Sequence, residues 1–70
     1  MAKYKNGNWL VVLALDAIHR KCTKQDGFNT VEQKQKALNI VRDAFGKELI
    51  SDVYALTMMK EFMLMPVKNS

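Results

Sequence analysis

The chain has almost no means of covalent or metal reinforcement. Among its 70 residues there is one cysteine, Cys22, so no disulfide can form within the chain. A structural zinc site takes about four Cys or His ligands, and one cysteine with one histidine, His19, cannot supply them. A domain this short buries a modest fraction of its surface, and self-association is the remaining common reinforcement. We therefore expect a single domain over residues 1–70 that has no metal or cofactor and is completed by homodimerisation.

Long apolar runs are also missing. The longest, from Trp9 to Leu15, falls short of the roughly 18 residues that a membrane-spanning helix needs. This run follows Lys3 and Lys5 in the manner of a secretion signal, but Asp16 comes next and no pair of small residues marks a cleavage site. The sequence therefore predicts no membrane contact and, with its one reduced thiol, a cytoplasmic location.

Glycine and proline are scarce, and they divide the chain into three helical stretches. Gly27 marks a turn, Gly46 closes a helix and Pro66 ends the last one. Between these points the spacing of apolar residues is that of amphipathic helices. The predicted helices span about residues 9–22, 30–45 and 47–64. Three helices around one core make an all-α domain, with loose ends at 1–8 and 66–70.

The start of the second predicted helix carries a capping signal. Asn29 is followed three residues later by Glu32, and Thr30 by Gln33. Either pair can form a capping box, in which each side chain satisfies an unpaired backbone amide of the other residue. The sequence leaves both pairs open.

The stretch from Lys47 to Met65 carries the most informative pattern. If it is one continuous helix, its apolar side changes to the opposite face near its middle. The first apolar side contains Leu49, Ile50, Val53 and Tyr54, and the second contains Met58, Met59, Phe62 and Met63. A straight helix with this pattern needs one packing partner for the apolar side of its first half and another for that of its second half. Methionine is also over-used on surfaces that adapt to partners, so we predict that the Met-rich end binds protein.

The predicted partner-binding residues combine this Met-rich end with the spare apolar side of the first helix. They are Trp9, Val12, Leu13, Met58, Met59, Phe62, Met63 and Met65. The alternative is that the Met-rich stripe belongs to the chain's own core. The first interpretation predicts a small non-enzymatic regulatory or adaptor protein that binds another protein, as a homodimer, and has no small-molecule substrate.

Positive charge is concentrated in the first half of the chain. The net charge is +4, and residues 1–36 carry all of it, with seven Lys or Arg against three Asp or Glu. A second hypothesis is therefore a nucleic-acid-binding regulator, since phosphate contact needs only clustered cations; a plain solvated surface is the simpler interpretation. The residues of this hypothesis are Lys3, Lys5, Arg20, Lys21 and Lys24. A helix-turn-helix motif centred on Gly46 is disfavoured, because Arg42 and Asp52 stand where that motif has a small and a buried aliphatic residue.

Two residue pairs carry side chains that can act in catalysis. His19 and Cys22 lie three residues apart on one predicted helix, and such a pair can generate a thiolate nucleophile. Cys22 falls on the apolar stripe, where free cysteine behaves as a small hydrophobic residue. Glu48 and Asp52 lie at the start of a predicted helix, where the helix dipole favours negative charge. Both pairs are better explained structurally, so we expect no enzyme.

Overall fold

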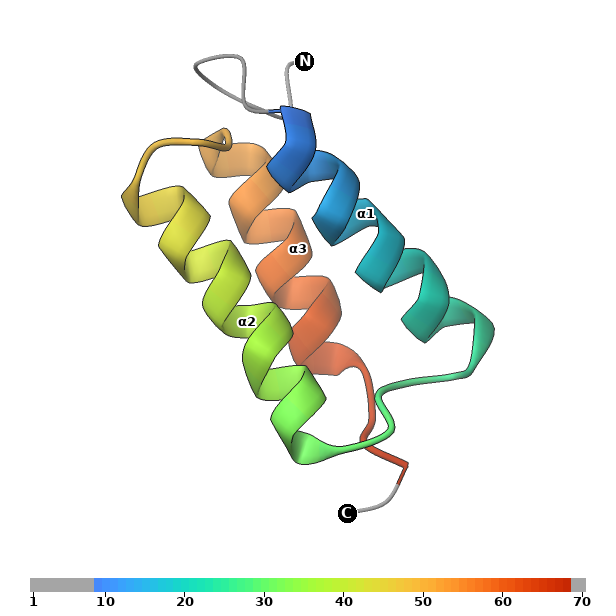
Figure 1. The fold of residues 1–70 in the computed structure, drawn as a ribbon. Coiled ribbons are helices and arrows are strands. Elements are labelled where there is room, and N and C mark those ends of the chain that lie inside the picture. The colour runs from blue at the N-terminus through green and yellow to red at the C-terminus, as the bar shows by residue number, and fades with distance from the viewer. Residues whose placement is uncertain (1–8, 69–70) are drawn as a thin grey trace.

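The computed structural model of the chain contains three α-helices, and it describes residues 9–68 (Figure 1). The helices are α1 (Trp9–Lys24), α2 (Val31–Gly46) and α3 (Asp52–Leu64). The predicted all-α fold with three helices is confirmed. Of the ends predicted to be loose, 1–8 and 66–70, residues 1–8 and 69–70 lie outside the described residues.

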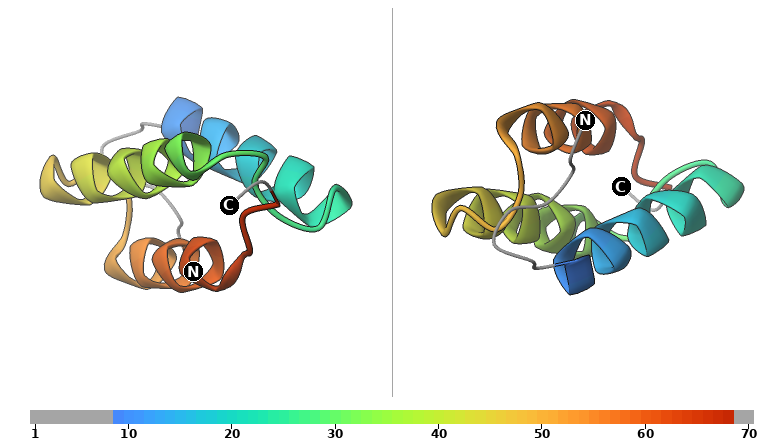
Figure 2. Two further views of the ribbon diagram at one scale, coloured as in Figure 1. Left: turned by 90° about the horizontal axis from the view of Figure 1, so that it is seen from below. Right: turned by 90° about the horizontal axis from the view of Figure 1, so that it is seen from above.

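The helices form two layers. α1 and α2 lie side by side and antiparallel, and α3 lies over them in a layer of its own (Figures 1 and 2). The core fills the space between the layers, where the rings of Phe28 and Phe62 meet edge to face with centroids 5.8 Å apart. The buried residues of this hydrophobic core are Val12, Leu15, Cys22, Phe28, Ala37, Val41, Ala44, Ile50, Tyr54, Ala55, Met58 and Phe62.

α2 begins at a capping box that uses one of the two predicted pairs. The Thr30 hydroxyl accepts a hydrogen bond from the Gln33 backbone N–H at 3.1 Å. In return the Gln33 side-chain oxygen accepts from the backbone N–H of Asn29 at 3.2 Å. The pair of Thr30 and Gln33 therefore fixes the start of α2, and the return bond goes one residue further back than in the usual box.

α2 ends slightly later than the sequence predicted, because Gly46 is its last helical residue. The turn is made by Glu48, which has the left-handed φ of 57° that glycine normally supplies. The Leu49 N–H donates to the Ala44 carbonyl at 2.9 Å, and the Glu48 N–H donates to the Phe45 carbonyl at 3.1 Å. This pair of bonds is the Schellman arrangement, which satisfies carbonyls that the helix end leaves free.

α3 begins five residues later than predicted, at Asp52 instead of Lys47. The Ser51 hydroxyl caps it by accepting from the Tyr54 backbone N–H at 3.2 Å. Ile50 therefore lies in the link between α2 and α3, where it is completely buried. The predicted helix over 47–64 is wrong at its start, because the Schellman turn after α2 occupies the residues that were assigned to its first turn.

The corrected start removes the change of face predicted for the third helix. Within α3 the buried residues are Tyr54, Ala55, Met58 and Phe62. They lie at helical spacing on one side, so α3 packs against its own chain through a single continuous stripe.

The segment after α3 is tied to the α1–α2 loop. The Phe28 N–H donates to the Pro66 carbonyl at 2.9 Å, and the Lys68 N–H donates to the Phe28 carbonyl at 2.8 Å. Gly27, with φ of 131°, lies so close that a Cβ on it would be 2.3 Å from the Pro66 oxygen. Of the end predicted to be loose, residues 66–68 thus hold defined backbone contacts with Phe28.

A lysine of α2 closes the end of α3. The Lys34 ammonium donates to the Met63 carbonyl at 2.9 Å and to the Met65 carbonyl at 2.8 Å. These carbonyls have no partner within the helix, and a cation there also interacts favourably with the helix dipole.

We expect Lys34→Met to lower the free energy of unfolding by about 1 kcal/mol, since two charge-assisted bonds to partly exposed carbonyls are lost. Urea denaturation followed by circular dichroism measures this. Lys36→Met is the matched control, because Lys36 lies on the same helix and is exposed. Equal effects of the two substitutions would contradict the capping role of Lys34.

Candidate protein-binding surface

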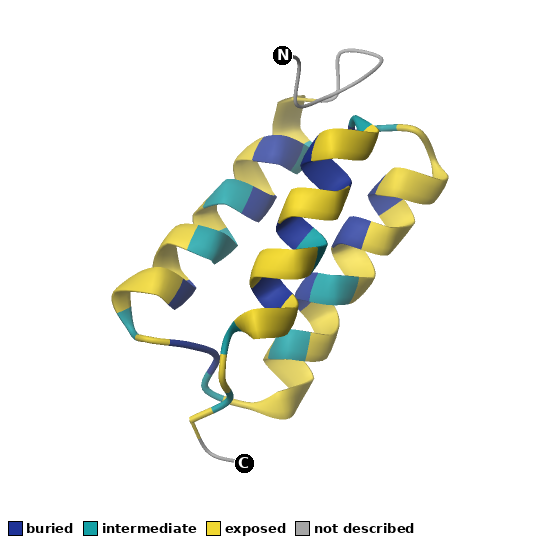
Figure 3. Cartoon of the chain, turned by 180° about the vertical axis from the view of Figure 1, so that it is seen from behind, coloured by how far each residue is buried: buried dark blue, intermediate teal, exposed yellow. Residues whose placement is uncertain are grey.

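The outward face of α3 is unusually apolar for a surface helix. Its residues Val53, Leu56, Met63 and Leu64 are between 52% and 75% exposed. Figure 3 shows α3 in front of α1 and α2, with exposed turns facing the viewer and buried turns behind. Only Asp52, Thr57, Lys60 and Glu61 of its 13 residues are polar. A helix that is apolar all round normally has partners on all sides, whereas the described residues cover α3 on one side alone.

A groove between α2 and α3 extends this apolar face. It has a volume of about 280 Å³ and opens beside Leu56. Phe45, which is 49% exposed, stands at its α2 edge, and Arg42 is its one charged residue. The lining residues are Val41, Arg42, Phe45, Ala55, Leu56 and Met59.

α1 adds apolar residues at the other edge of α3. Asp16 faces α3, because its carboxylate accepts a hydrogen bond from the Tyr54 hydroxyl at 2.6 Å. Trp9 and Leu13 lie two turns and one turn before Asp16 and so project towards the same side of α1. Both side chains are more than half exposed.

Most of the exposed apolar residues therefore gather on one side of the molecule. Val31 joins them, since it lies one turn before Lys34, which reaches the end of α3. We call this region the α3-side surface: Trp9, Leu13, Val31, Phe45, Val53, Leu56, Met63 and Leu64. These are eight of the ten large apolar residues that are exposed among residues 9–68; the other two are Leu10 and Ile40.

The predicted partner-binding residues divide between this surface and the core. Trp9, Leu13 and Met63 are exposed on it, and Met59 and Met65 are partly buried. Met58 and Phe62 are buried in the chain's own core, so the alternative of a core stripe holds for these two, and Val12 of α1 is buried as well. None of the three is accessible to a partner in this conformation, because the stripe of α3 turns Met58 and Phe62 towards α1 and α2, and Val12 is a core residue of α1.

Sequence reasoning missed five members of the α3-side surface: Val31, Phe45, Val53, Leu56 and Leu64. For α3 the missing signal was Ser51, whose hydroxyl caps the helix. With Ser51 as its cap the helix starts at Asp52 and has 13 residues, and Val53, Leu56 and Leu64 lie on one side of it.

Two polar pairs across the seam between α1 and α3 were also missed. The Tyr54 hydroxyl donates to Asp16 at 2.6 Å, and it lies 3.4 Å from the Val12 carbonyl oxygen. The imidazole Nε2 of His19 lies 2.6 Å from a Glu61 carboxylate oxygen. These contacts hold α1 parallel to α3 and so position Trp9 beside α3.

The environment of Tyr54 favours its protonated form. Burial raises the pKa of the Tyr54 phenol well above its usual value, and the hydrogen bond to the Asp16 carboxylate and its negative charge raise it further. The folded chain therefore binds the phenol proton more tightly than the unfolded chain does.

It follows that this part of the stability is present below about pH 10, the ordinary tyrosine pKa, and is lost as the pH rises beyond it. We expect the free energy of unfolding to fall by up to about 1.4 kcal/mol per pH unit through this proton. Urea denaturation over that alkaline range measures the slope. Tyr54→Phe removes the ionisable group and should give a shallower slope, whereas an unchanged slope would contradict the assignment.

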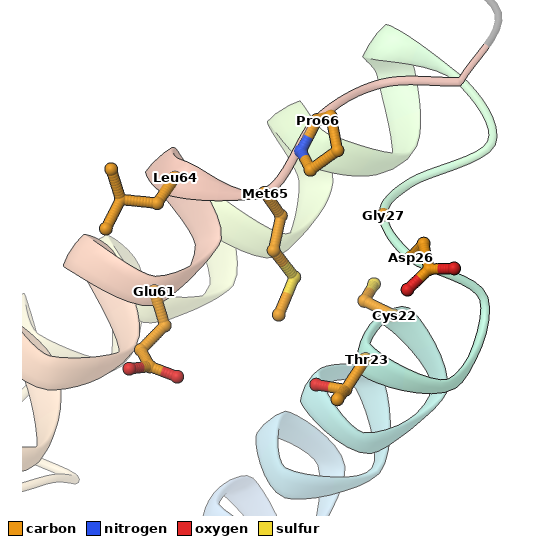
Figure 4. Close-up of a pocket in the computed structure, with 8 residues that line it drawn as sticks. All are labelled: Cys22, Thr23, Asp26, Gly27, Glu61, Leu64, Met65 and Pro66. Carbon is orange, nitrogen blue, oxygen red and sulfur yellow. The ribbon is translucent and has the colours of Figure 1, made fainter.

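His19 and Cys22 do not form an activated thiol in the described structure. Cys22 is buried, and burial raises the pKa of its thiol, which neighbouring Lys21 offsets only in part. The thiol is thus held in its unreactive, protonated form. Beside it lies a pocket of about 430 Å³. Figure 4 shows Met65 projecting into this pocket from the end of α3. His19 contacts Glu61, and within residues 9–68 no three His, Cys, Asp or Glu side chains come together as metal ligands.

The predicted pair Glu48 and Asp52 is not a pair on one helix. Glu48 makes the left-handed turn after α2, while Asp52 lies in the first turn of α3. The negative charge of Asp52 near the helix start agrees with the dipole argument.

The structure describes three of the five residues that were predicted to bind nucleic acid. Arg20, Lys21 and Lys24 are exposed near the end of α1. Lys21 also lines a groove of about 200 Å³ between α1 and α2, with Lys36 among its other lining residues. Lys3 and Lys5 lie outside the described residues.

Comparisons with known proteins gave no match to a family model, to a curated protein or to a solved structure. In the part of the chain that the structure describes, no helix has the length and apolar character needed to cross a bilayer.

Proposed function

We propose that this chain is a small non-enzymatic regulatory or adaptor protein that binds protein through its α3-side surface. The observation that carries the proposal is the gathering of eight of the ten exposed large apolar residues of the described chain on one side. Exposed apolar residues scattered singly are ordinary, whereas a contiguous group indicates an interaction site.

The energy available at this surface is large for a small domain. Completing the burial of Val53, Leu56, Met63 and Leu64, each now more than half exposed, would contribute about 1 kcal/mol per side chain. The total of several kcal/mol, before the entropy of ordering is subtracted, compares with the 5–15 kcal/mol typical of a whole domain.

The shape and composition favour a protein over a small molecule. The outward face of α3 is a ridge, and the groove beside it, of about 280 Å³, is below the 300–1,000 Å³ usual for small-molecule sites. Aromatic residues, methionine and arginine are enriched at protein interfaces. Trp9, Phe45 and Met63 belong to the surface, and Arg42 lines its groove.

We expect Leu56→Asp to abolish association through the α3-side surface, because a partner would have to bury an unpaired carboxylate. Sedimentation velocity measures self-association, and mass spectrometry of co-purified proteins measures binding of other proteins. The matched control is Leu10→Asp. Leu10 is 64% exposed, as Leu56 is 71% exposed, but it lies about 100° further round α1 from Trp9. If both variants associate like the unmodified chain, the proposal fails.

A second candidate function is binding of a polyanion such as nucleic acid by the end of α1. Arg20, Lys21 and Lys24 are exposed there, and none of them has an ion-pair partner among residues 9–68. Clustered free cations suffice for contact with phosphates. The apolar α3-side surface has no role in this function, so the two candidates are separable.

For this second candidate, binding of a double-stranded oligonucleotide should weaken steeply as salt rises, by about 0.9 in the log–log slope per phosphate contact. Lys21→Gln with Lys24→Gln should then lower the slope by about 2. A mobility-shift series over salt measures it, with Lys60→Gln on α3 as the control variant. No binding at low salt would remove this candidate.

A further inference from the structure

We infer that the protein covering the α3-side surface is a second copy of this chain, paired about a two-fold axis with its α3 antiparallel to the first. This inference rests on the proposed function, because it names the partner of that same surface. In a two-fold dimer each copy uses the same surface, so every contact occurs twice.

The distribution of residues along the surface suits such an axis. Beside the start of α3 lie Trp9, Leu13, Phe45, Val53 and Leu56, and beside its end lie Val31, Met63 and Leu64. Between Leu56 and Met63 the exposed residues of α3 are polar: Thr57, Lys60 and Glu61. An axis that crosses α3 near its middle exchanges its two ends. It therefore brings the apolar start of each copy onto the apolar end of the other.

The spacing along α3 matches a helix–helix seam. Val53, Leu56, Lys60 and Met63 follow one another at intervals of three, four and three residues, as the seam positions of paired helices do. In the antiparallel arrangement Val53 lies opposite Met63 of the second copy. Leu56 then lies opposite Lys60 of the second copy.

The charge of Lys60 decides the direction of pairing. A parallel seam in register would set Lys60 directly against Lys60 of the second copy, and like charges at close range oppose association. The antiparallel seam offsets the two ammonium groups and lets the stem of each Lys60 cover Leu56 while its charge stays in water. Lys60 is exposed and has no ion-pair partner among the described residues, so its side chain is free to do this.

The same two-fold rotation also brings the exposed apolar residues of α1 and α2 against the second copy. The α1 flank of the first copy, with Trp9 and Leu13, lies over the end of α3 of the second copy, where Leu64 is 75% exposed. On the other flank, Phe45 of the first copy lies over the start of α2 of the second copy, where Val31 is exposed. Trp9 and Phe45 are aromatic, a class of residue that is enriched at protein interfaces.

Disulfide trapping tests the direction of pairing. Val53→Cys and Met63→Cys are prepared as separate full chains, mixed, and exposed to oxidised glutathione. Both positions are more than half exposed, so the fold should accept the thiol, which circular dichroism checks. We expect a cross-linked dimer in the mixture and little in either variant alone. Ten residues separate the two positions, about 15 Å along a helix, which is too far for a disulfide within one chain.

The other outcomes each overturn the inference. Efficient cross-linking of either variant alone would show a parallel pair. No cross-linking, together with a monomeric mass of the unmodified chain by sedimentation equilibrium, would show that the chain does not pair with itself. In that case a co-purified protein lost in Leu56→Asp would leave the proposed function standing. The unmodified chain is the control for Cys22, whose buried thiol should not cross-link.

Discussion

The rest of this structure depends on the packing of one buried stripe of α3 against α1 and α2. Tyr54, Met58 and Phe62 follow one another at intervals of four residues and turn inwards together. Once they are buried, the other side of α3 must face outwards whatever its composition, because a helix has a fixed pitch. The polar contacts of Asp16 and His19 then fix α1 alongside. The apolar outer surface is thus a direct result of how the core is filled.

Much of the fold could be predicted from sequence, because local signals determined it. The three helices, the turn at Gly27 and the Thr30 cap all follow from residues close together in the chain. The start of α3 could not be predicted in this way. The stretch after Gly46 contains residues compatible with a helix, and the left-handed turn at Glu48 is one that sequence patterns assign to glycine.

The candidate surface was predicted less well than the fold, for a related physical reason. A helix with apolar residues on every side gives no indication of which side its own chain will cover. Phe62 and Met63 are neighbours of similar character, yet Phe62 is fully buried and Met63 is 61% exposed. Their burial differs only because α1 and α2 lie on the side of α3 that carries Phe62. On the first helix Trp9, Val12 and Leu13 were predicted as one group, yet Trp9 and Leu13 are more than half exposed and Val12 is buried.

The backbone hydrogen bonds between Phe28 and the segment after α3 affect the order in which the chain can fold. Phe28 precedes α2, but the backbone groups that pair with it belong to Pro66 and Lys68, nearly 40 residues later. Its ring also packs on Phe62. A hairpin of α1 and α2 alone would lack the contact that covers this ring from the side of α3. During synthesis the loop between α1 and α2 therefore reaches its final structure only after residues 66–68 have left the ribosome.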